Sequence, residues 1–144
     1  HPISPMQKMV QEGTFVVMTD EEVVSEIRML VADLHEMHSY FSSGDFSLNL
    51  LMMVDGYLDE KKGNMLRDLD DFLSLNQQQK QAYALLRRSA PSAMYPIDVV
   101  RDQNVLAQIL PEIEKIERNY KDFYKYIEML MTYQLPQPQT DQWV

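Results

Sequence analysis

Residues 111–135, PEIEKIERNYKDFYKYIEMLMTYQL, decide the fold class of this chain. Apolar and aromatic residues recur there at alternating spacings of three and four, which places them on one face of a helix. Pro111 suits the first turn of a helix, where its missing N–H is not needed, and Pro136 would end it. The pattern predicts one long helix with a wide apolar stripe, typical of a helix in a globular core. The predicted core positions are Ile113, Ile116, Tyr120, Phe123, Ile127 and Leu130.

A second strong helical pattern follows Thr19. Thr19 and Glu22 have the spacing of a capping box, in which each residue satisfies a backbone N–H of the other. Apolar residues then recur over about 22 residues, and Gly44 ends the pattern. We expect this helix to pack antiparallel to the helix over residues 111–135. Its predicted core positions are Val23, Ile27, Leu30, Leu34, Met37 and Phe41.

Shorter helices are predicted between these two. Gly56 lies inside the first of these helices, which spans residues 46–63, and weakens it by about 1 kcal/mol relative to Ala. Residues 13–18, GTFVVM, have strand-like composition but no partner strand, so we expect an extended segment that packs Phe15 and Val17 on the helices. The shorter helices are residues 46–63 capped by Asp45, with Leu50, Leu51, Val54 and Leu58 in the core; residues 64–73; residues 77–90 capped by Asn76; and residues 99–110 capped by Asp98.

These patterns predict an all-α fold: a single compact bundle of five to six mostly antiparallel helices. A chain of 144 residues is long enough to bury one core, and one domain is the default at this length. We expect residues 1–18 to be an irregular, extended N-terminal lead-in, residues 19–135 to be the bundle, and residues 136–144 to be a flexible tail.

Charge and composition exclude several functions. A net charge of −9 argues against a nucleic-acid-binding protein, because phosphates are bound by clustered Lys and Arg. The chain has no cysteine, which excludes disulfides, thiolate metal sites and a cysteine nucleophile. No apolar run approaches the length of a transmembrane helix, about 18 residues. The P-loop and the GxGxxG and GxSxG patterns are absent, which argues against common nucleotide-dependent and hydrolytic enzymes.

The start of the chain leaves localisation open. Because it begins with His1 rather than Met, we expect a fragment or a processed form, and whether an upstream targeting segment has been lost stays open. A cytoplasmic location is slightly favoured for the remainder. Homo-oligomerisation also stays open at this point.

His35 and His38 are the internal histidines, three residues apart in DLHEMH. Two imidazoles with a nearby carboxylate can bind a metal, so they are the candidate metal ligands of this sequence. The HExxH pattern of zinc proteases needs histidines four apart, and no second ligand cluster is evident. The preferred interpretation is a solvated helix face with no resident cofactor.

Two groups of residues are candidates for binding a protein partner. Acidic residues follow one another from Asp55 to Asp71 without the glycine and glutamate of an EF-hand, so they indicate either a solvated helix face or an acidic docking patch. Tyrosines are frequent in residues 111–135, as in protein interfaces, although a half-buried helix with tyrosines at its edges is the preferred explanation. The candidate partner-binding residues are Tyr120, Tyr124, Tyr126, Tyr133, Asp68, Asp70 and Asp71.

The function that these features favour is a non-catalytic helical interaction module, an adaptor or assembly subunit. It would dock a protein partner, possibly a basic one, through a helix face and an acidic surface. One alternative is a bundle that binds a small apolar ligand in a cavity larger than about 300 Å³, lined by Met52, Met53 and Met131. A second alternative is a metal-dependent enzyme that uses His35 and His38.

Overall fold

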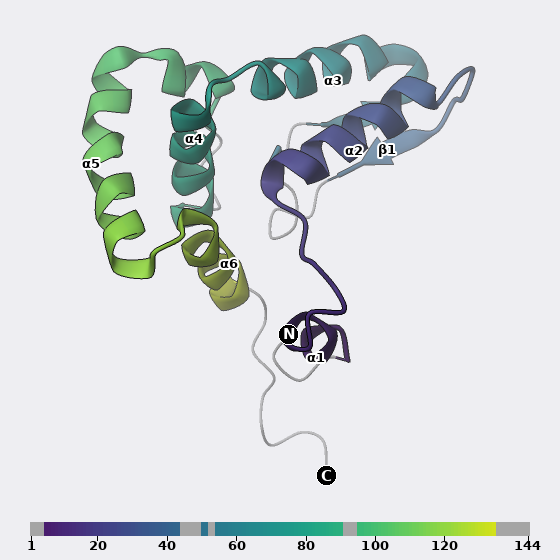
Figure 1. Cartoon of the computed structure of the whole chain (residues 1–144). Helices are drawn as coiled ribbons and strands as arrows, with labels where there is room; N and C mark the ends of the chain where they lie inside the picture. The colour runs from purple at the N-terminus through teal and green to yellow at the C-terminus, as the bar shows by residue number, and fades with distance from the viewer. Residues whose placement is uncertain (1–4, 44–49, 52–53, 91–94, 135–144) are drawn as a thin grey trace.

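The computed structural model describes residues 5–43, 50–51, 54–90 and 95–134 (Figure 1). Within these ranges the chain is mostly helical and carries only a two-stranded sheet, which confirms the predicted predominance of helix. The elements in chain order are α1 (Pro5–Gln11), α2 (Asp20–Asp33), β1 (Tyr40–Ser42), β2 (Asp55–Tyr57), α3 (Leu58–Leu73), α4 (Gln77–Ser89), the 3-10 helix η1 (Ile97–Arg101), α5 (Gln103–Tyr120) and α6 (Phe123–Gln134).

α2 begins where the sequence predicts but ends early. The Glu22 backbone N–H donates to Thr19 Oγ1 over 3.3 Å, and the Thr19 backbone N–H donates to Glu22 Oε2 over 2.7 Å. These two bonds confirm the capping box. The predicted continuation to Gly44 is wrong, because the chain leaves the helix after Asp33 and Glu36 takes a left-handed conformation with a φ of +52°.

The buried face of α2 also differs from the predicted stripe. Its buried residues are Val24 and Val31. Leu30 is 52% exposed, and Met37 lies beyond the helix and is 41% exposed. Phe41, the last predicted core position of this helix, is half-buried in β1. Ile27 and Leu34, two other predicted positions, are partly buried against the core, so the apolar spacing located the helix and only part of the side that it buries.

The segment between α2 and α3 contains a β-hairpin that the sequence analysis missed. β1 and β2 pair antiparallel, with Phe41 opposite Gly56. Gly56 has a φ of +134°, which L side chains rarely adopt and which is incompatible with the predicted helix over residues 46–63. Asp45, the expected cap of that helix, lies outside the described residues.

α3 joins two predicted segments into one helix. It passes without a break through Lys62 and Gly63, where a helix end was predicted. Lys62 Nζ donates instead to the backbone oxygens of Ala32 and Leu34, over 2.8 and 2.6 Å. A cation at these carbonyls stabilises the C-terminal end of α2 and holds it against α3. The buried side chains of α3 are Leu58, Met65, Leu69 and Phe72.

α4 begins as predicted at Asn76, which forms a second capping box with Gln79. Its centre packs on the end of α3, where the rings of Phe72 and Tyr83 lie 6.0 Å apart. Its last turn carries Arg88, which is buried. Charged side chains are seldom buried unless they are paired, so this end of α4 indicates an interior polar contact.

The predicted single helix over residues 111–135 is wrong. Pro111 lies inside α5, and the helix ends at Lys121, whose φ of +61° is left-handed. Asp122 then starts α6, because its Oδ1 accepts the backbone N–H of Tyr124 over 2.9 Å. The left-handed residue turns the chain back, so α5 and α6 lie against each other instead of forming one rod.

Most of the predicted core positions of this stretch are confirmed. Tyr120 is the exception, because it is 43% exposed next to the turn between α5 and α6. Leu130 is half-buried against the core. The buried positions are Ile113, Ile116, Phe123 and Ile127.

The predicted helix over residues 99–110 is divided between η1 and the start of α5. The cap is Asp102 rather than Asp98, since Asp102 Oδ1 accepts the backbone N–H of Asn104 over 2.8 Å. Asp98 lies inside η1.

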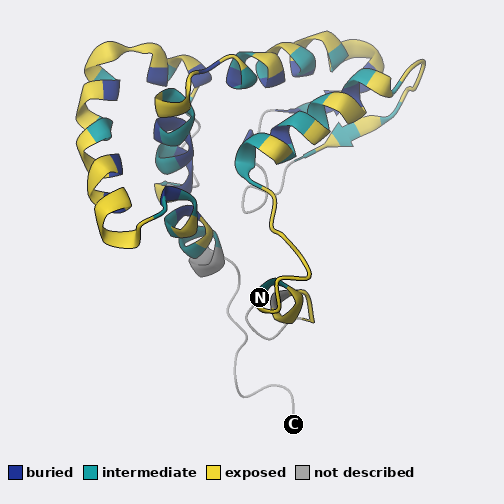
Figure 2. Ribbon diagram, viewed as in Figure 1, coloured by how far each residue is buried: buried dark blue, intermediate teal, exposed yellow. Residues whose placement is uncertain are grey.

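The elements pack in two sets. α2 and the hairpin pack on α3, while α4, η1, α5 and α6 pack on one another (Figure 1). The buried apolar residues of both sets form one cluster. α1, where an irregular lead-in was predicted, lies apart from these helices in Figure 1. Residues 12–19, called the arm below, connect it to α2, and Figure 2 shows most of the arm as exposed.

Candidate functional site

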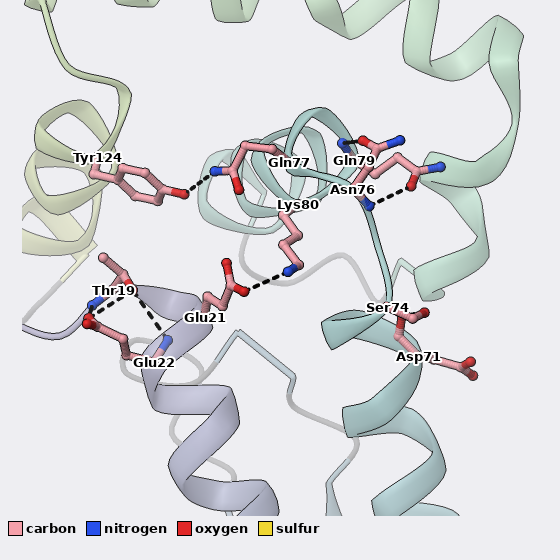
Figure 3. A network of polar contacts seen from close by, with 10 residues as sticks. All are labelled: Thr19, Glu21, Glu22, Asp71, Ser74, Asn76, Gln77, Gln79, Lys80 and Tyr124. Atoms are coloured by element: carbon pink, nitrogen blue, oxygen red, sulfur yellow. Dashed lines mark hydrogen bonds and ion pairs between the residues drawn. The ribbon is translucent and has the colours of Figure 1, made fainter.

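α4 holds the first turns of α2 and α6 through polar side chains (Figure 3). Lys80 Nζ lies 2.7 Å from Glu21 Oε1, at the start of α2. Gln77 Nε2 donates to the Tyr124 hydroxyl, at the start of α6, over 2.6 Å. Burial raises the pKa of the Tyr124 hydroxyl. The starts of α2 and α6 are thereby fixed relative to each other through α4.

A buried ion pair strengthens the same junction. Arg88 Nη2, at the end of α4, donates to Asp20 Oδ1 over 2.5 Å. The two side chains are 1% and 9% exposed. Asp20 Oδ2 is also buried and has no hydrogen-bond partner in the part of the chain that the structure describes. A buried carboxylate oxygen without a donor is unfavourable, so Asp20 retains an unused capacity to accept a hydrogen bond.

The arm is hydrogen-bonded to a helix at each end. Its N-terminal end folds back on α1, where the backbone N–H and Oγ1 of Thr14 both donate to the Met9 carbonyl, over 2.9 and 3.1 Å. Its C-terminal end is Thr19 of the α2 capping box, in which hydrogen bonds to Thr19 lower the pKa of Glu22. Four consecutive apolar residues between these two ends are exposed: Phe15 by 37%, Val16 by 81%, Val17 by 46% and Met18 by 39%.

The arm and α6 form the two walls of an open apolar groove, called the arm groove below, with a volume of about 480 Å³. Phe15 and Val17 were expected to pack on the bundle. That expectation is wrong, since both stay more than a third exposed and form an open wall of the groove. The apolar lining includes Val10, Phe15, Val17, Met18, Ile127 and Met131.

Charged residues also line the arm groove. The lining includes three carboxylates and one cation. The carboxylates are those of Asp20, Asp122 and Glu128, and the cation is Lys125. The charge of Asp20 is offset by Arg88. The lining of the groove therefore carries charges of both signs, in a chain with a net charge of −9.

The predicted partner-binding tyrosines are divided between two hollows. Tyr124 lines the arm groove. Tyr120 and Tyr126 line a second hollow of about 340 Å³ among α4, α5 and α6, with their ring centroids 4.9 Å apart. The side chain of Tyr133 lies outside the described part of the chain. α6 thus contributes tyrosines to both hollows.

The predicted acidic residues on α3 contact cations of neighbouring elements. Arg28 Nε lies 2.9 Å from Asp70 Oδ1, and this hydrogen bond lowers the pKa of Asp70. Arg101 Nη2 lies 3.6 Å from Asp71 Oδ1. Burial raises the pKa of the half-buried Asp68. Two of the three carboxylates therefore join α3 to α2 and to η1, and their role in binding a partner stays a prediction.

The predicted histidine pair is not on a helix, because α2 ends before His35. His38 Nδ1 lies 2.6 Å from Asp59 Oδ2, and its ring stacks on Tyr57 at 5.0 Å. Among the described residues, no three His, Asp or Glu side chains come together in a way that could hold a metal ion. His35 is exposed.

Sequence reasoning missed most of the arm groove. The available signal was GTFVVM, an uncharged apolar run directly before a capping box with no strand to pair with. Lys125 and Glu128 had no distinguishing pattern, because their place beside the arm depends on the turn after α5. In the part of the chain described by the structure, no helix is both long and apolar enough to cross a membrane.

Comparison with family models, with curated proteins and with solved structures found no significant match to this chain.

Proposed function

We propose that this chain is a non-catalytic helical interaction module, a single compact domain that docks a protein partner in the arm groove. The observation that carries the proposal is the groove itself, which has a volume of about 480 Å³. Four consecutive apolar residues of the arm, each more than a third exposed, lie opposite Tyr124, Ile127 and Met131 of α6. Apolar surface of this kind on a soluble protein is typical of a binding site.

The arm groove is suited to binding because it is already formed. The arm is hydrogen-bonded to α1 at Thr14 and to α2 at Thr19, and α6 is held to α4 through Tyr124. A preformed site loses less conformational entropy on binding than a segment that must first become ordered. Covering the arm would remove its apolar side chains from water, at about 25 cal/mol for each Å² buried.

Charge supports a basic partner. The carboxylates of Asp122 and Glu128 lie beside the apolar lining, and the chain carries a net charge of −9. Such a field steers basic proteins toward the site and raises the association rate more than the affinity. Tyr120 and Tyr126 of the second hollow, and the carboxylates of α3, are the further contacts of a larger partner.

A site-specific photo-crosslinker tests the proposal. Benzoylphenylalanine placed at Val16, which lines the arm groove and is 81% exposed, is compared with the same group at Leu30, which is 52% exposed and outside the groove. We expect one protein from the source cells to be linked through position 16 and not through position 30.

A second substitution makes this result specific. Val17→Gln, in the groove wall, should abolish the crosslink at position 16, while Met29→Gln, at an apolar position on α2 that is 55% exposed, should leave it unchanged. Equal labelling from positions 16 and 30, or a product that survives Val17→Gln, would contradict docking in the arm groove.

The alternative is a small apolar ligand in the same groove. Its volume falls within the range of ligand sites, roughly 300–1,000 Å³, and Met18 and Met131 are adaptable lining residues. Met52 and Met53, the other methionines expected to line a cavity, lie outside the described residues. Native mass spectrometry of the untreated protein separates the two functions, because a carried ligand adds a few hundred daltons that Val17→Gln should remove.

A further inference from the structure

We infer that the outer face of the β-hairpin binds an arginine side chain of a protein partner, with the guanidinium stacked on the Tyr40 ring and paired with the Asp55 carboxylate. Both residues lie outside the lining of the arm groove. The inference therefore goes beyond docking in that groove and does not depend on it. It rests on an exposed aromatic ring and on a carboxylate beside it that has no ion-pair partner among the described residues.

Strand pairing places the tyrosines of the hairpin on one face. Tyr40 in β1 lies opposite Tyr57 in β2, and Asp55 precedes Tyr57 by two residues. Side chains alternate between the two faces of a strand, so Tyr40, Tyr57 and Asp55 share one face. Phe41 and Gly56 belong to the other face, which is the inner one because Phe41 is half-buried and Gly56 is buried. The tyrosines therefore mark the outer face of the hairpin.

The outer face carries an open aromatic ring. The rings of Tyr40 and Tyr57 are perpendicular, with an angle of 89° between their planes and 5.3 Å between their centroids. His38 stacks on Tyr57 with centroids 5.0 Å apart and covers one face of that ring. Among the described residues, Tyr40 has no other ring contact, and it is 57% exposed. Since a perpendicular neighbour covers at most one face of a ring, Tyr40 keeps a face open to solvent.

A negative charge lies at the hydroxyl end of the Tyr40 ring. The Tyr40 hydroxyl donates to Asp55 Oδ2 over 3.1 Å. The donor is neutral, and Asp55 forms no ion pair within the described part of the chain, so its charge is not compensated. The hydrogen bond to Asp55 and the charge of this carboxylate raise the pKa of Tyr40, as expected beside an ionised group. A cation lying over the Tyr40 ring is therefore also within reach of a carboxylate.

Two nearby cations do not offset this charge. His38 lies on Tyr57, and its Nδ1 is 2.6 Å from Asp59 Oδ2, so a positive charge on the imidazole is compensated by Asp59. The side chain of Lys61 packs beside Gly56, where its Cδ lies 2.5 Å from the position of an added Cβ. Gly56 belongs to the inner face of the hairpin. The negative charge at the open ring is therefore offset by neither residue.

A ring joined to a carboxylate selects arginine among the cationic side chains. The guanidinium is planar, stacks on aromatic faces and forms two parallel hydrogen bonds with one carboxylate. The ammonium of lysine is a compact point charge without such a plane or fork. An arginine that crosses the Tyr40 ring toward Asp55 uses both contacts at once. The net charge of −9 attracts basic segments of a partner to this surface.

Three blocked tripeptides test the inference with the full chain, with arginine, lysine or citrulline between two glycines. Lysine has the charge of arginine without its planar group, and citrulline has nearly its shape without the charge. NMR of protein with isotope-labelled tyrosine rings gives the affinities, and loss of a signal in Tyr40→Phe assigns Tyr40. We expect the arginine peptide to shift the Tyr40 signal and to bind at least about threefold more tightly than the lysine peptide and about tenfold more tightly than the citrulline peptide.

Variants of the hairpin separate stacking from general attraction, with the Tyr57 signal as the readout. Tyr40→Leu removes the ring and should weaken arginine binding by about three- to fivefold, whereas Tyr40→Phe keeps the ring and should retain most of the affinity. Asp55→Asn should weaken binding by about two- to fivefold and reduce its salt dependence. Glu114→Gln, the same loss of charge at an exposed position on α5, is the matched control and should leave the affinity unchanged. Circular dichroism checks that each variant keeps its fold.

The outcomes distinguish a built site from attraction to an acidic protein. Equal binding of the arginine and lysine peptides, or equal effects of Asp55→Asn and Glu114→Gln, would overturn the site. Tyrosine signals that respond to the arginine peptide while the Tyr40 signal stays unchanged would overturn it as well. The crosslinker at Val16 tests the arm groove separately, so failure of the hairpin site leaves the docking function intact and the reverse also holds.

Discussion

Arg88 in the last turn of α4 forms a buried ion pair with Asp20, the first residue of α2, across 68 positions of the chain. The pair joins the two packed sets of helices beside the arm groove, and its side chains are 1% and 9% exposed. A buried pair contributes little net stability compared with apolar residues of similar size, but losing one partner leaves an uncompensated charge. The orientation of α2 relative to α4 therefore depends on both residues.

Replacing Arg88 with Met should destabilise the protein by about 3–5 kcal/mol, because the Asp20 carboxylate would stay buried without its cation. Urea denaturation followed by circular dichroism measures this loss. Arg118→Met, at an exposed position on α5, is the control and should change the stability by less than about 0.5 kcal/mol. The double variant Asp20→Leu with Arg88→Met should regain part of the loss. A cost below about 1 kcal/mol for Arg88→Met would contradict the buried pair.

The His38–Asp59 contact should make stability depend on pH. The hydrogen bond and the charge of Asp59 raise the pKa of His38 above its ordinary value of 6.5. The pair therefore stabilises the fold fully below that ordinary value, and the contribution is lost as the pH rises through the raised pKa of the folded state. The stability difference between the wild type and Asp59→Asn should be larger near pH 6 than near pH 9. NMR titration should show a lower His38 pKa in Asp59→Asn, and an unchanged pKa would rule out the contact.

Two glycine substitutions in neighbouring elements should have opposite effects. Gly56 has a φ of +134° in β2, and an added Cβ would lie 2.5 Å from Lys61 Cδ. Lys61 can move, so the main cost of Gly56→Ala is backbone strain, about 1–3 kcal/mol. Gly63 lies inside α3 with no atom near an added Cβ, so Gly63→Ala should stabilise the protein by about 0.5–1 kcal/mol. Thermal denaturation compares both with the wild type. Stabilisation by Gly56→Ala would contradict the positive φ of Gly56 and support the helix that was predicted over residues 46–63.

Replacing Pro111 with Ala should stabilise α5. The helix runs through this proline, which removes one backbone hydrogen bond, to the Ala107 carbonyl, and crowds that oxygen. Both residues are exposed, so water can reach the carbonyl and the helix tolerates the proline. We expect a gain of about 1–3 kcal/mol, measured as a rise in the denaturation midpoint without a change in slope. Destabilisation instead would indicate that the helix breaks at Pro111, as the sequence pattern suggested.

The features that could be predicted from the sequence are those formed within a few residues. Thr19 with Glu22 and Asn76 with Gln79 close their hydrogen bonds inside one helical turn, so their residue types and spacing suffice to locate the starts of α2 and α4. Ile113 and Ile116 were also predicted correctly as buried, because a strong apolar stripe identifies its inner side without knowledge of the neighbours.

The ends of the helices and the candidate site were decided by contacts between distant residues. α2 stops where Lys62 of α3 caps its carbonyls, and the hairpin that follows depends on pairing across residues 40–57. The arm groove exists because Lys121 turns α6 back and because α4 fixes the starts of α2 and α6 through Glu21 and Tyr124.

By itself, the sequence determined that this chain is mostly helical and where two of its helices begin, since propensity, capping and apolar period act over one or two turns. Only the tertiary structure decided where those helices stop, which of their apolar residues stay exposed, and that Phe15 faces α6 rather than the core. The reason is physical: whether an apolar side chain is buried depends on what packs against it, and the α6 residues that line the groove opposite Phe15 lie more than a hundred residues away in the chain.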